Sequence, residues 1–179
     1  MATTYQKADP DVLSLLLRAM ADWHPELREA GVEVGVLMAY NPDGPAVKHH
    51  GAPAFATIRV VSLKDRVSKS YDAEMLIDEG EWGRFREHHR SALVDHELKH
   101  LQLVPLSPKE RKAAQREDPK APWWKLDDLG RPRLKLRPGD WDAGDGFKEV
   151  VARHGDVAIE YMNLASAKAK ADAAREKKE

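Results

Sequence analysis

The sequence predicts an α+β fold: a compact domain in which a small mixed or antiparallel sheet packs against one central helix and its flanking helices. Short apolar, β-branched segments in the first half and a long periodic segment at 82–104 indicate this class. The 179 residues are 42% hydrophobic and 33% charged, which suits one domain with a sizeable core. We expect this domain to span residues 1–160. Residues 161–179 are rich in Ala and Lys and predict a charged helical tail.

The bulk composition restricts the chemistry. Cysteine is absent, which excludes disulfides and thiolate metal sites, so any metal must be bound by His and carboxylate side chains. The formal net charge of −1 indicates no general attraction to nucleic acid or acidic membranes. The N-terminus lacks a secretory signal, and no apolar run approaches the ~18 residues of a membrane span. We expect a cytoplasmic protein that makes no membrane contact.

The N-terminal region predicts one amphipathic helix that ends before Pro25. Asp9 or Asp11 can cap it, and Pro10 suits its first turn. A single apolar stripe follows at helical spacing: Val12, Leu15, Leu16, Ala19 and Trp23. His24, beside Pro25, is expected to be a helix-terminus residue rather than a ligand.

Three strands are expected next, at residues 32–40, 55–63 and 74–78. The first two are rich in β-branched residues, and a turn cluster follows the first. The loop between these two strands carries His49 and His50, which we expect to be exposed, with a role beside a ligand as the alternative. The third strand runs directly into the long periodic segment.

That segment contains the motif His96-Glu97-Leu98-Lys99-His100. In a helix, residues four apart lie one above the other on one face, so both imidazoles can bind the same ion. Glu97 lies about 100° around the helix from His96 and can reach a water on that ion. This HExxH arrangement is typical of two zinc ligands and a general base for hydrolysis. The alternative is a surface helix with solvated histidines.

A catalytic zinc needs a third protein ligand. The acidic turn at 138–146 offers Asp140, Asp142 and Asp145 just before a second amphipathic helix at 147–154. Asp145 can instead cap that helix. We predict Asp142 as the third ligand, with Asp140 and Asp145 next. Glu149 on the helix itself is a further candidate, and His154 is expected to be a helix C-terminal residue.

The segment Lys109–Arg137 carries 10 basic and 5 acidic residues around an aromatic pair, Trp123 and Trp124. Basic residues interleaved with aromatics can bind single-stranded nucleic acid, here through the tryptophans, Arg131 and Arg133, so DNA association is one hypothesis. The favoured alternative is a charged segment whose tryptophans pack onto the core. The pattern predicts a short helix at 108–116 and a hairpin at 124–136.

The chain resembles the phage- and prophage-associated metallopeptidases, a group similar to the SprT-like zincins. The resemblance spans Val32–Gly155 and rests on LIDEGEW leading into ALVDHELKHLQ, with support from DLGRPRLKL and GFKEVVARHG. It implies a compact zincin-like domain with zinc at His96 and His100 and with Glu97 as base. The last strand before the motif helix commonly edges the cleft in zincins, so residues 74–78 are expected there. Relatives often carry a histidine just before the last helix, where this chain has Gly139 and the aspartates.

The leading hypothesis is a zinc-dependent metallopeptidase that acts on a protein or peptide substrate. Two alternatives remain: a nucleic-acid-associated module with a structural zinc, and a degenerate zincin that binds a protein partner. Tyr161 or the loop histidines could supply an oxyanion donor. Asp95 could orient a metal ligand, or it could be an ordinary exposed carboxylate.

Overall fold

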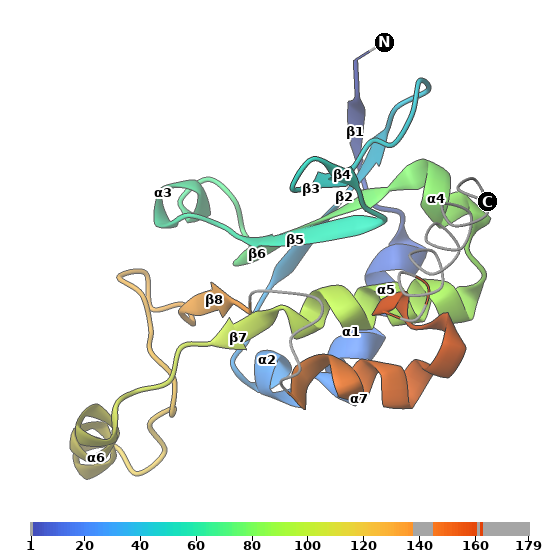
Figure 1. Cartoon of the computed structure of the whole chain (residues 1–179). Coiled ribbons are helices and arrows are strands. Elements are labelled where there is room, and N and C mark those ends of the chain that lie inside the picture. Colours follow the sequence, from blue (N-terminus) through green and yellow to red (C-terminus); the bar gives the residue numbers. More distant parts are fainter. Residues whose placement is uncertain (1, 138–144, 161, 163–179) are drawn as a thin grey trace, which may run out of the picture.

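The computed structural model describes residues 2–137, 145–160 and 162, and it is an α+β fold (Figure 1). For Asp145 and Gly146, only the backbone is described. Asp140 and Asp142 lie outside the described residues, as does the predicted tail apart from Met162. The boundary at residue 160 therefore stays a prediction.

The main sheet has four strands in the order β1-β2-β6-β5. They span Thr4–Lys7 (β1), Val34–Tyr40 (β2), Ala73–Asp78 (β6) and Ala56–Val60 (β5). β2 and β6 are parallel, whereas the two outer pairs are antiparallel, so the sheet is mixed as predicted. The expectation that residues 74–78 edge the cleft is wrong. β6 is hydrogen-bonded on both sides, and β5 is the edge strand on that side.

Helices α1, α5 and α7 cover one face of this sheet, with α5 between the other two (Figure 1). They span Pro10–Trp23 (α1), Glu87–Lys99 (α5) and Asp145–His154 (α7), and the short α2 spans Pro25–Glu29. The predicted stripe of α1 is confirmed at four positions, because Val12, Leu15, Leu16 and Ala19 are buried. Met20 completes the buried face, whereas Trp23 is only partly buried.

The prediction of one helix across 82–104 is wrong. Asp78 caps a separate short helix, α4 (Glu79–Arg84), by accepting a hydrogen bond from the Glu81 amide at 3.1 Å. The chain then continues through α5 and becomes strand β7 at Leu101–Leu103. β7 pairs with β8 (Leu134–Leu136), so its apolar residues belong to a two-stranded ribbon.

The remaining elements are short. They are β3 (Lys48–His49), β4 (Ala52–Pro53), α3 (Leu63–Arg66), α6 (Pro108–Glu117) and the 3-10 turn η1 (Gly155–Val157). The predicted helix near 108–116 is confirmed and begins with a capping box between Ser107 and Glu110. Gly155 directly follows α7, with φ of 61° in the left-handed region that glycine adopts readily. Within the described residues, no helix is both long and apolar enough to cross a membrane.

Candidate metal centre

The motif lies at the C-terminal end of the central helix α5. All seven residues from Ala92 to Leu98 are buried, including His96 and Glu97. His100 is the C-cap, but its φ and ψ of −67° and −24° remain helical. It therefore keeps the helical spacing from His96, and the Nε2 atoms of the two rings lie 3.3 Å apart.

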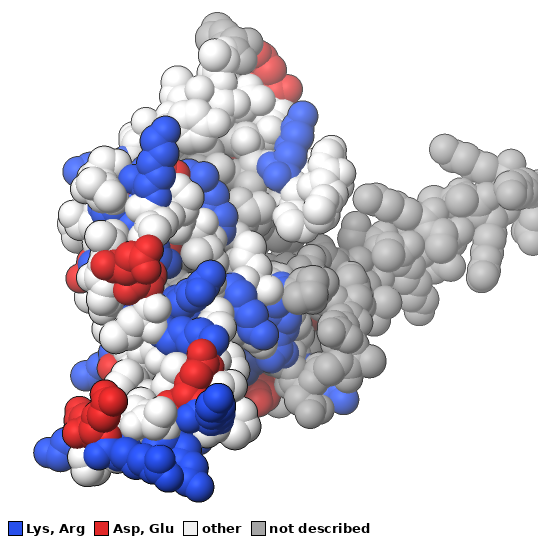
Figure 2. All heavy atoms as spheres, turned by 90° about the vertical axis from the view of Figure 1, so that its left-hand side faces the viewer, with Lys and Arg blue, Asp and Glu red and all other residues white. Residues whose placement is uncertain are grey.

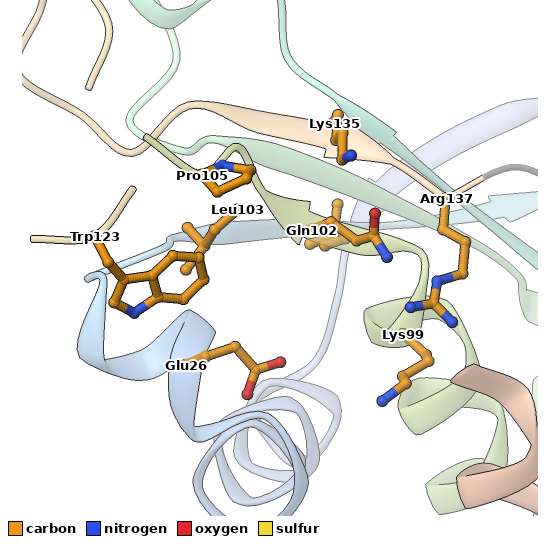
Figure 3. A pocket seen from close by; sticks show the side chains of 9 residues that line it. Glu26, Lys99, Gln102, Leu103, Pro105, Trp123, Lys135 and Arg137 are labelled. Atoms are coloured by element: carbon orange, nitrogen blue, oxygen red, sulfur yellow. The ribbon is translucent and has the colours of Figure 1, made fainter. Parts of the chain in front are cut away.

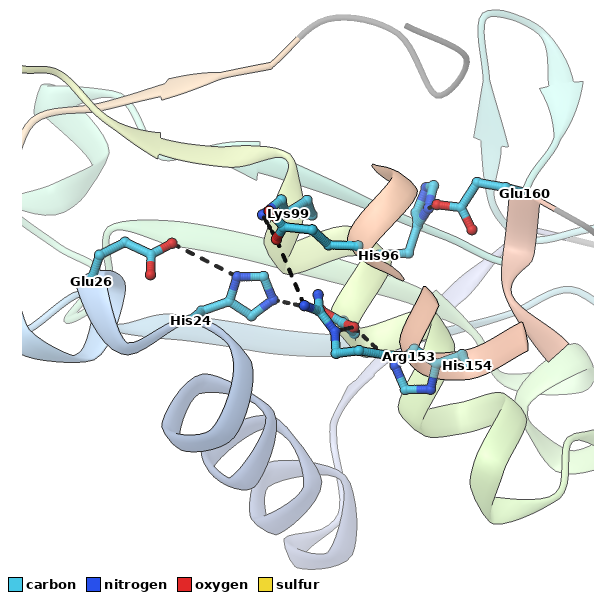
Figure 4. A network of polar contacts seen from close by, with 9 residues as sticks. His24, Glu26, His96, Lys99, Arg153, His154 and Glu160 are labelled. Atoms are coloured by element: carbon cyan, nitrogen blue, oxygen red, sulfur yellow. Dashed lines mark hydrogen bonds and ion pairs between the residues drawn. The ribbon is translucent and has the colours of Figure 1, made fainter. Parts of the chain in front are cut away.

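The other ring nitrogen of each histidine has an acceptor. His96 Nδ1 lies 2.9 Å from Oε1 of Glu160, and the two side chains point toward one another in Figure 4. His100 Nδ1 lies 3.2 Å from the carbonyl oxygen of Arg137. A carboxylate and a carbonyl oxygen accept hydrogen bonds, so Nδ1 carries the proton in both rings. The two Nε2 atoms then face one another.

The Nε2 atoms of His96 and His100 lie 3.3 Å apart. Nitrogen ligands lie about 2.0–2.1 Å from zinc, and tetrahedral geometry separates two such ligands by about 3.3–3.4 Å. The observed separation fits this value. Metal-binding histidines commonly donate their second N–H to a carboxylate or backbone carbonyl, which fixes the ring orientation. Glu160 and Arg137 supply both kinds of partner, so the pair fits a zinc ion.

The third ligand is not identified. Within the described ranges, no group of three or more His, Asp or Glu residues could hold a metal. Asp140 and Asp142 lie outside those ranges, and for Asp145 only its position as the first residue of α7 is described. The Glu149 carboxylate is instead 2.7 Å from Lys99 Nζ. Asp142 therefore stays a prediction.

Glu160 was not identified from the sequence. It lies just after η1 and is buried, as are its neighbours Ala158 and Ile159. Its Oε2 atom is buried without a hydrogen-bond partner among the described residues. A lone acidic residue within an apolar run is the sequence signal that could have indicated it, because a buried carboxylate needs a partner.

A second polar cluster surrounds Asp95, which is fully buried. Its carboxylate accepts hydrogen bonds from Nε2 of His24 at 2.7 Å, Nε and Nη2 of Arg153 at 2.8 and 2.9 Å, and Nε2 of His154 at 2.9 Å. Burial by itself would raise the Asp95 pKa, but the hydrogen bonds from His24 and Arg153 outweigh it and lower the pKa to about 2. Asp95 is thus neither exposed nor a partner of His96 or His100. Through His24 at the end of α1 and through Arg153 and His154 at the end of α7, which Figure 4 labels, Asp95 joins both helices to α5.

The predicted nucleic-acid residues differ in their exposure and in their partners. Trp124 is partly buried against the core, whereas Trp123 is 38% exposed. Arg131 forms ion pairs with Asp72 at 2.8 Å and Glu33 at 3.3 Å, and Arg133 is exposed. Figure 2 shows acidic side chains among the basic ones on this face. Nucleic-acid binding stays a prediction.

The candidate oxyanion donors are also untested. His49 and His50 are exposed on the β3–β4 hairpin, with ring centroids 4.1 Å apart. Tyr161 lies outside the described residues. Lys99, the charged residue inside the motif, turns to the surface and pairs with Glu149.

Comparison with known proteins bears on the family. A family model described as "Putative phage metallopeptidase" matches residues 5–169, which include the histidine pair and Glu160. This confirms the resemblance predicted from the motifs, whereas the likeness to SprT-like proteins stays a prediction. No curated protein and no solved structure matches the chain. Because the family match spans nearly the whole chain, this protein belongs to the phage metallopeptidase family.

Proposed function

We propose that the protein is a zinc-dependent peptide hydrolase in which His96, His100 and Asp142 hold the metal and Glu97 is the general base. The observation that carries the proposal is the 3.3 Å separation of the two Nε2 atoms, each in a ring whose Nδ1 faces an acceptor. The family assignment supports peptides as substrates.

A zinc ion bound there would supply Lewis-acid polarisation of the substrate carbonyl and acidify a bound water. Glu97 would accept the water proton as the water attacks the carbonyl and would then deliver that proton to the leaving amine. The side chain of Glu97 is buried, so little solvent competes for the proton. Glu160 and the Arg137 carbonyl would keep both imidazoles in the metal-binding tautomer.

Metal content tests the ligands. We expect about one zinc per chain in wild type by mass spectrometry, with loss in His96→Ala and in Asp142→Ala. Asp128→Ala, a change at an exposed aspartate, is the matched control and should keep the zinc. Loss in His96→Ala with retention in Asp142→Ala would reject Asp142 and direct attention to Asp140 and Asp145. Wild type that binds no zinc even when it is added would reject the whole proposal.

Peptide cleavage tests the base. Glu97→Gln should keep stoichiometric zinc while its kcat/KM for a mixed peptide pool falls at least 100-fold, because the general base is removed. Equal cleavage by wild type and Glu97→Gln would reject hydrolysis at this site. If only the degenerate alternative holds, neither protein cleaves any peptide although both bind zinc.

A further inference from the structure

A cleft of about 330 Å³ is lined by Lys99, which precedes His100 in the chain, and by Arg137, whose carbonyl oxygen contacts the His100 ring (Figure 3). Trp123 and Pro105 lie at one end, and Arg137 and Lys99 lie at the other. The volume is at the low end of the range for small-molecule sites, which suits a few side chains of a longer ligand. The cleft is thus mixed in character, aromatic at one end and cationic at the other.

The cationic end is fixed next to the histidine pair by backbone hydrogen bonds. The Arg137 amide donates to the His100 carbonyl at 2.7 Å, and the Arg137 carbonyl accepts from the His100 ring. Lys135 is directly opposite Gln102 in the β7–β8 ribbon, and paired residues project to the same face. Arg137, two residues beyond Lys135, shares this face. Two cations therefore follow one another outward from the metal ligands.

These two cations have no ion-pair partner within contact distance among the described residues, although Arg137 interacts at longer range with the Glu149 carboxylate, whose pKa is lowered first by the Lys99 hydrogen bond and also by Arg137. Lys99 is paired with Glu149, so its charge is largely offset. Arg137 donates two hydrogen bonds, at 2.7 and 2.8 Å, to the amide oxygen of Gln102, a neutral partner. Among the described residues, no carboxylate pairs with Lys135. Glu26 is the one acidic side chain among the described residues that line the cleft.

We infer that this cleft is a substrate subsite for an acidic peptide segment. A substrate carboxylate binds Lys135 and the guanidinium of Arg137, and an apolar side chain a few residues away packs on Trp123. This inference rests on the proposed function, because it assigns the scissile bond to the adjacent histidine pair. It names a substrate class, peptides with Asp or Glu near the cleaved bond.

Binding to a protein that cannot turn over tests the subsite separately from catalysis. Zinc-loaded Glu97→Gln would be titrated with a fluorescein-labelled peptide containing two Glu and one Leu, and with the same peptide carrying Gln for Glu. We expect at least tenfold tighter binding of the acidic peptide by fluorescence anisotropy. Lys135→Glu and Arg137→Gln, each added to Glu97→Gln, should reduce this preference to less than threefold. Lys7→Glu, an exposed lysine on β1, makes the same charge change away from the cleft and should leave the preference intact.

Three outcomes separate the inference from its alternatives. Equal affinity for the acidic and neutral peptides overturns the subsite, whatever the enzyme cleaves. Tighter binding of a single-stranded oligonucleotide than of the acidic peptide, lost in the same two variants, overturns the peptide assignment in favour of nucleic acid. If the acidic peptide binds selectively but wild type cleaves no peptide, the subsite inference is supported as a binding site and the proposed hydrolysis fails.

Discussion

Asp95 and His96 are neighbours on α5, and both are buried and hydrogen-bonded to residues from the C-terminal part of the chain. Around Asp95, three cationic or donor side chains surround one carboxylate, and both of its oxygens accept hydrogen bonds. Around His96, the Nε2 atoms of two imidazoles lie 3.3 Å apart, and Oε2 of Glu160 has no hydrogen-bond partner among the described residues. Both clusters include histidines and a carboxylate, but among the described residues only the Asp95 carboxylate has hydrogen-bond partners at both of its oxygens.

A structural polar cluster and a functional one differ in how their hydrogen bonds are satisfied. A buried polar group costs free energy unless it is paired, so a cluster that only stabilises the fold should satisfy its members internally. The Asp95 cluster does so and holds three helices together. The His96–His100 pair instead brings two ring nitrogens to 3.3 Å from one another, a separation that fits two ligands of one zinc ion.

The largest expected effect is that of zinc on the free energy of unfolding, because zinc should bind at the His96–His100 pair and not at the Asp95 cluster. Adding zinc to metal-free wild type at a thousandfold excess over its Kd should raise the free energy of unfolding by about 4 kcal/mol. His100→Ala should remove this gain because one imidazole ligand is lost, and urea titration with and without zinc measures it. An equal gain in His100→Ala would break the comparison, because the histidine pair would not be the site.

Asp95→Asn should lower the free energy of unfolding of the metal-free protein by about 3 kcal/mol, since it leaves a partly buried arginine and two histidines without their carboxylate. Urea unfolding measures this loss. The exposed change Asp128→Asn is the control and should stay within about 0.5 kcal/mol of wild type. A folded Asp95→Asn protein whose zinc affinity drops tenfold or more would contradict the separation of the two clusters.

Lowering the pH should remove the stabilisation that the Asp95 cluster provides. The Asp95 pKa is lowered from an ordinary value near 3.8 to about 2, so its contribution is fully present above pH 4 and is lost as the pH falls toward 2. The contribution is roughly 2 kcal/mol. We expect the unfolding free energy of metal-free wild type to fall more steeply across this window than that of Asp95→Asn. Parallel profiles would show that Asp95 titrates normally.

Glu160→Gln should have the smallest effect of the four. A glutamine oxygen can still accept from His96 Nδ1 but without the charge, so zinc affinity should fall about tenfold. Competition with a fluorescent chelator measures the Kd. Glu149→Gln, on the surface beside Lys99, is the matched control and should leave the Kd unchanged. Unchanged affinity in Glu160→Gln would mean that the carboxylate does not support the ligand.

Much of the fold could be predicted because its signals are local. The stripe of α1 and the strands β2, β5 and β6 follow from apolar spacing and β-branched runs. β1 was missed because all four of its residues are exposed and it forms only by pairing with β2. The end of the motif helix was missed because Leu101 continues the apolar spacing, and pairing with β8 some thirty residues later decides its conformation.

In the candidate site, too, the features set by local sequence could be predicted and those set by long-range packing could not. The spacing of His96 and His100 is a property of one helix, so their convergence could be predicted, and the structure brings the two rings together. Glu160 comes from another part of the chain, and no local pattern aligns it with His96. The partners of Asp95 likewise lie 58 to 71 residues away. Long-range packing, rather than propensity, determines which carboxylate meets which histidine.

The two hydrogen bonds between His100 and Arg137 have a thermodynamic consequence. They make the orientation of a metal ligand depend on the docking of β8, so zinc affinity and β8 docking must favour each other by the same factor. Zinc loading should therefore slow amide hydrogen exchange at Arg137 and along the β7–β8 ribbon. By the same linkage, a substrate that binds the docked β7–β8 ribbon increases the affinity for zinc. Substrate binding and zinc binding are then positively cooperative.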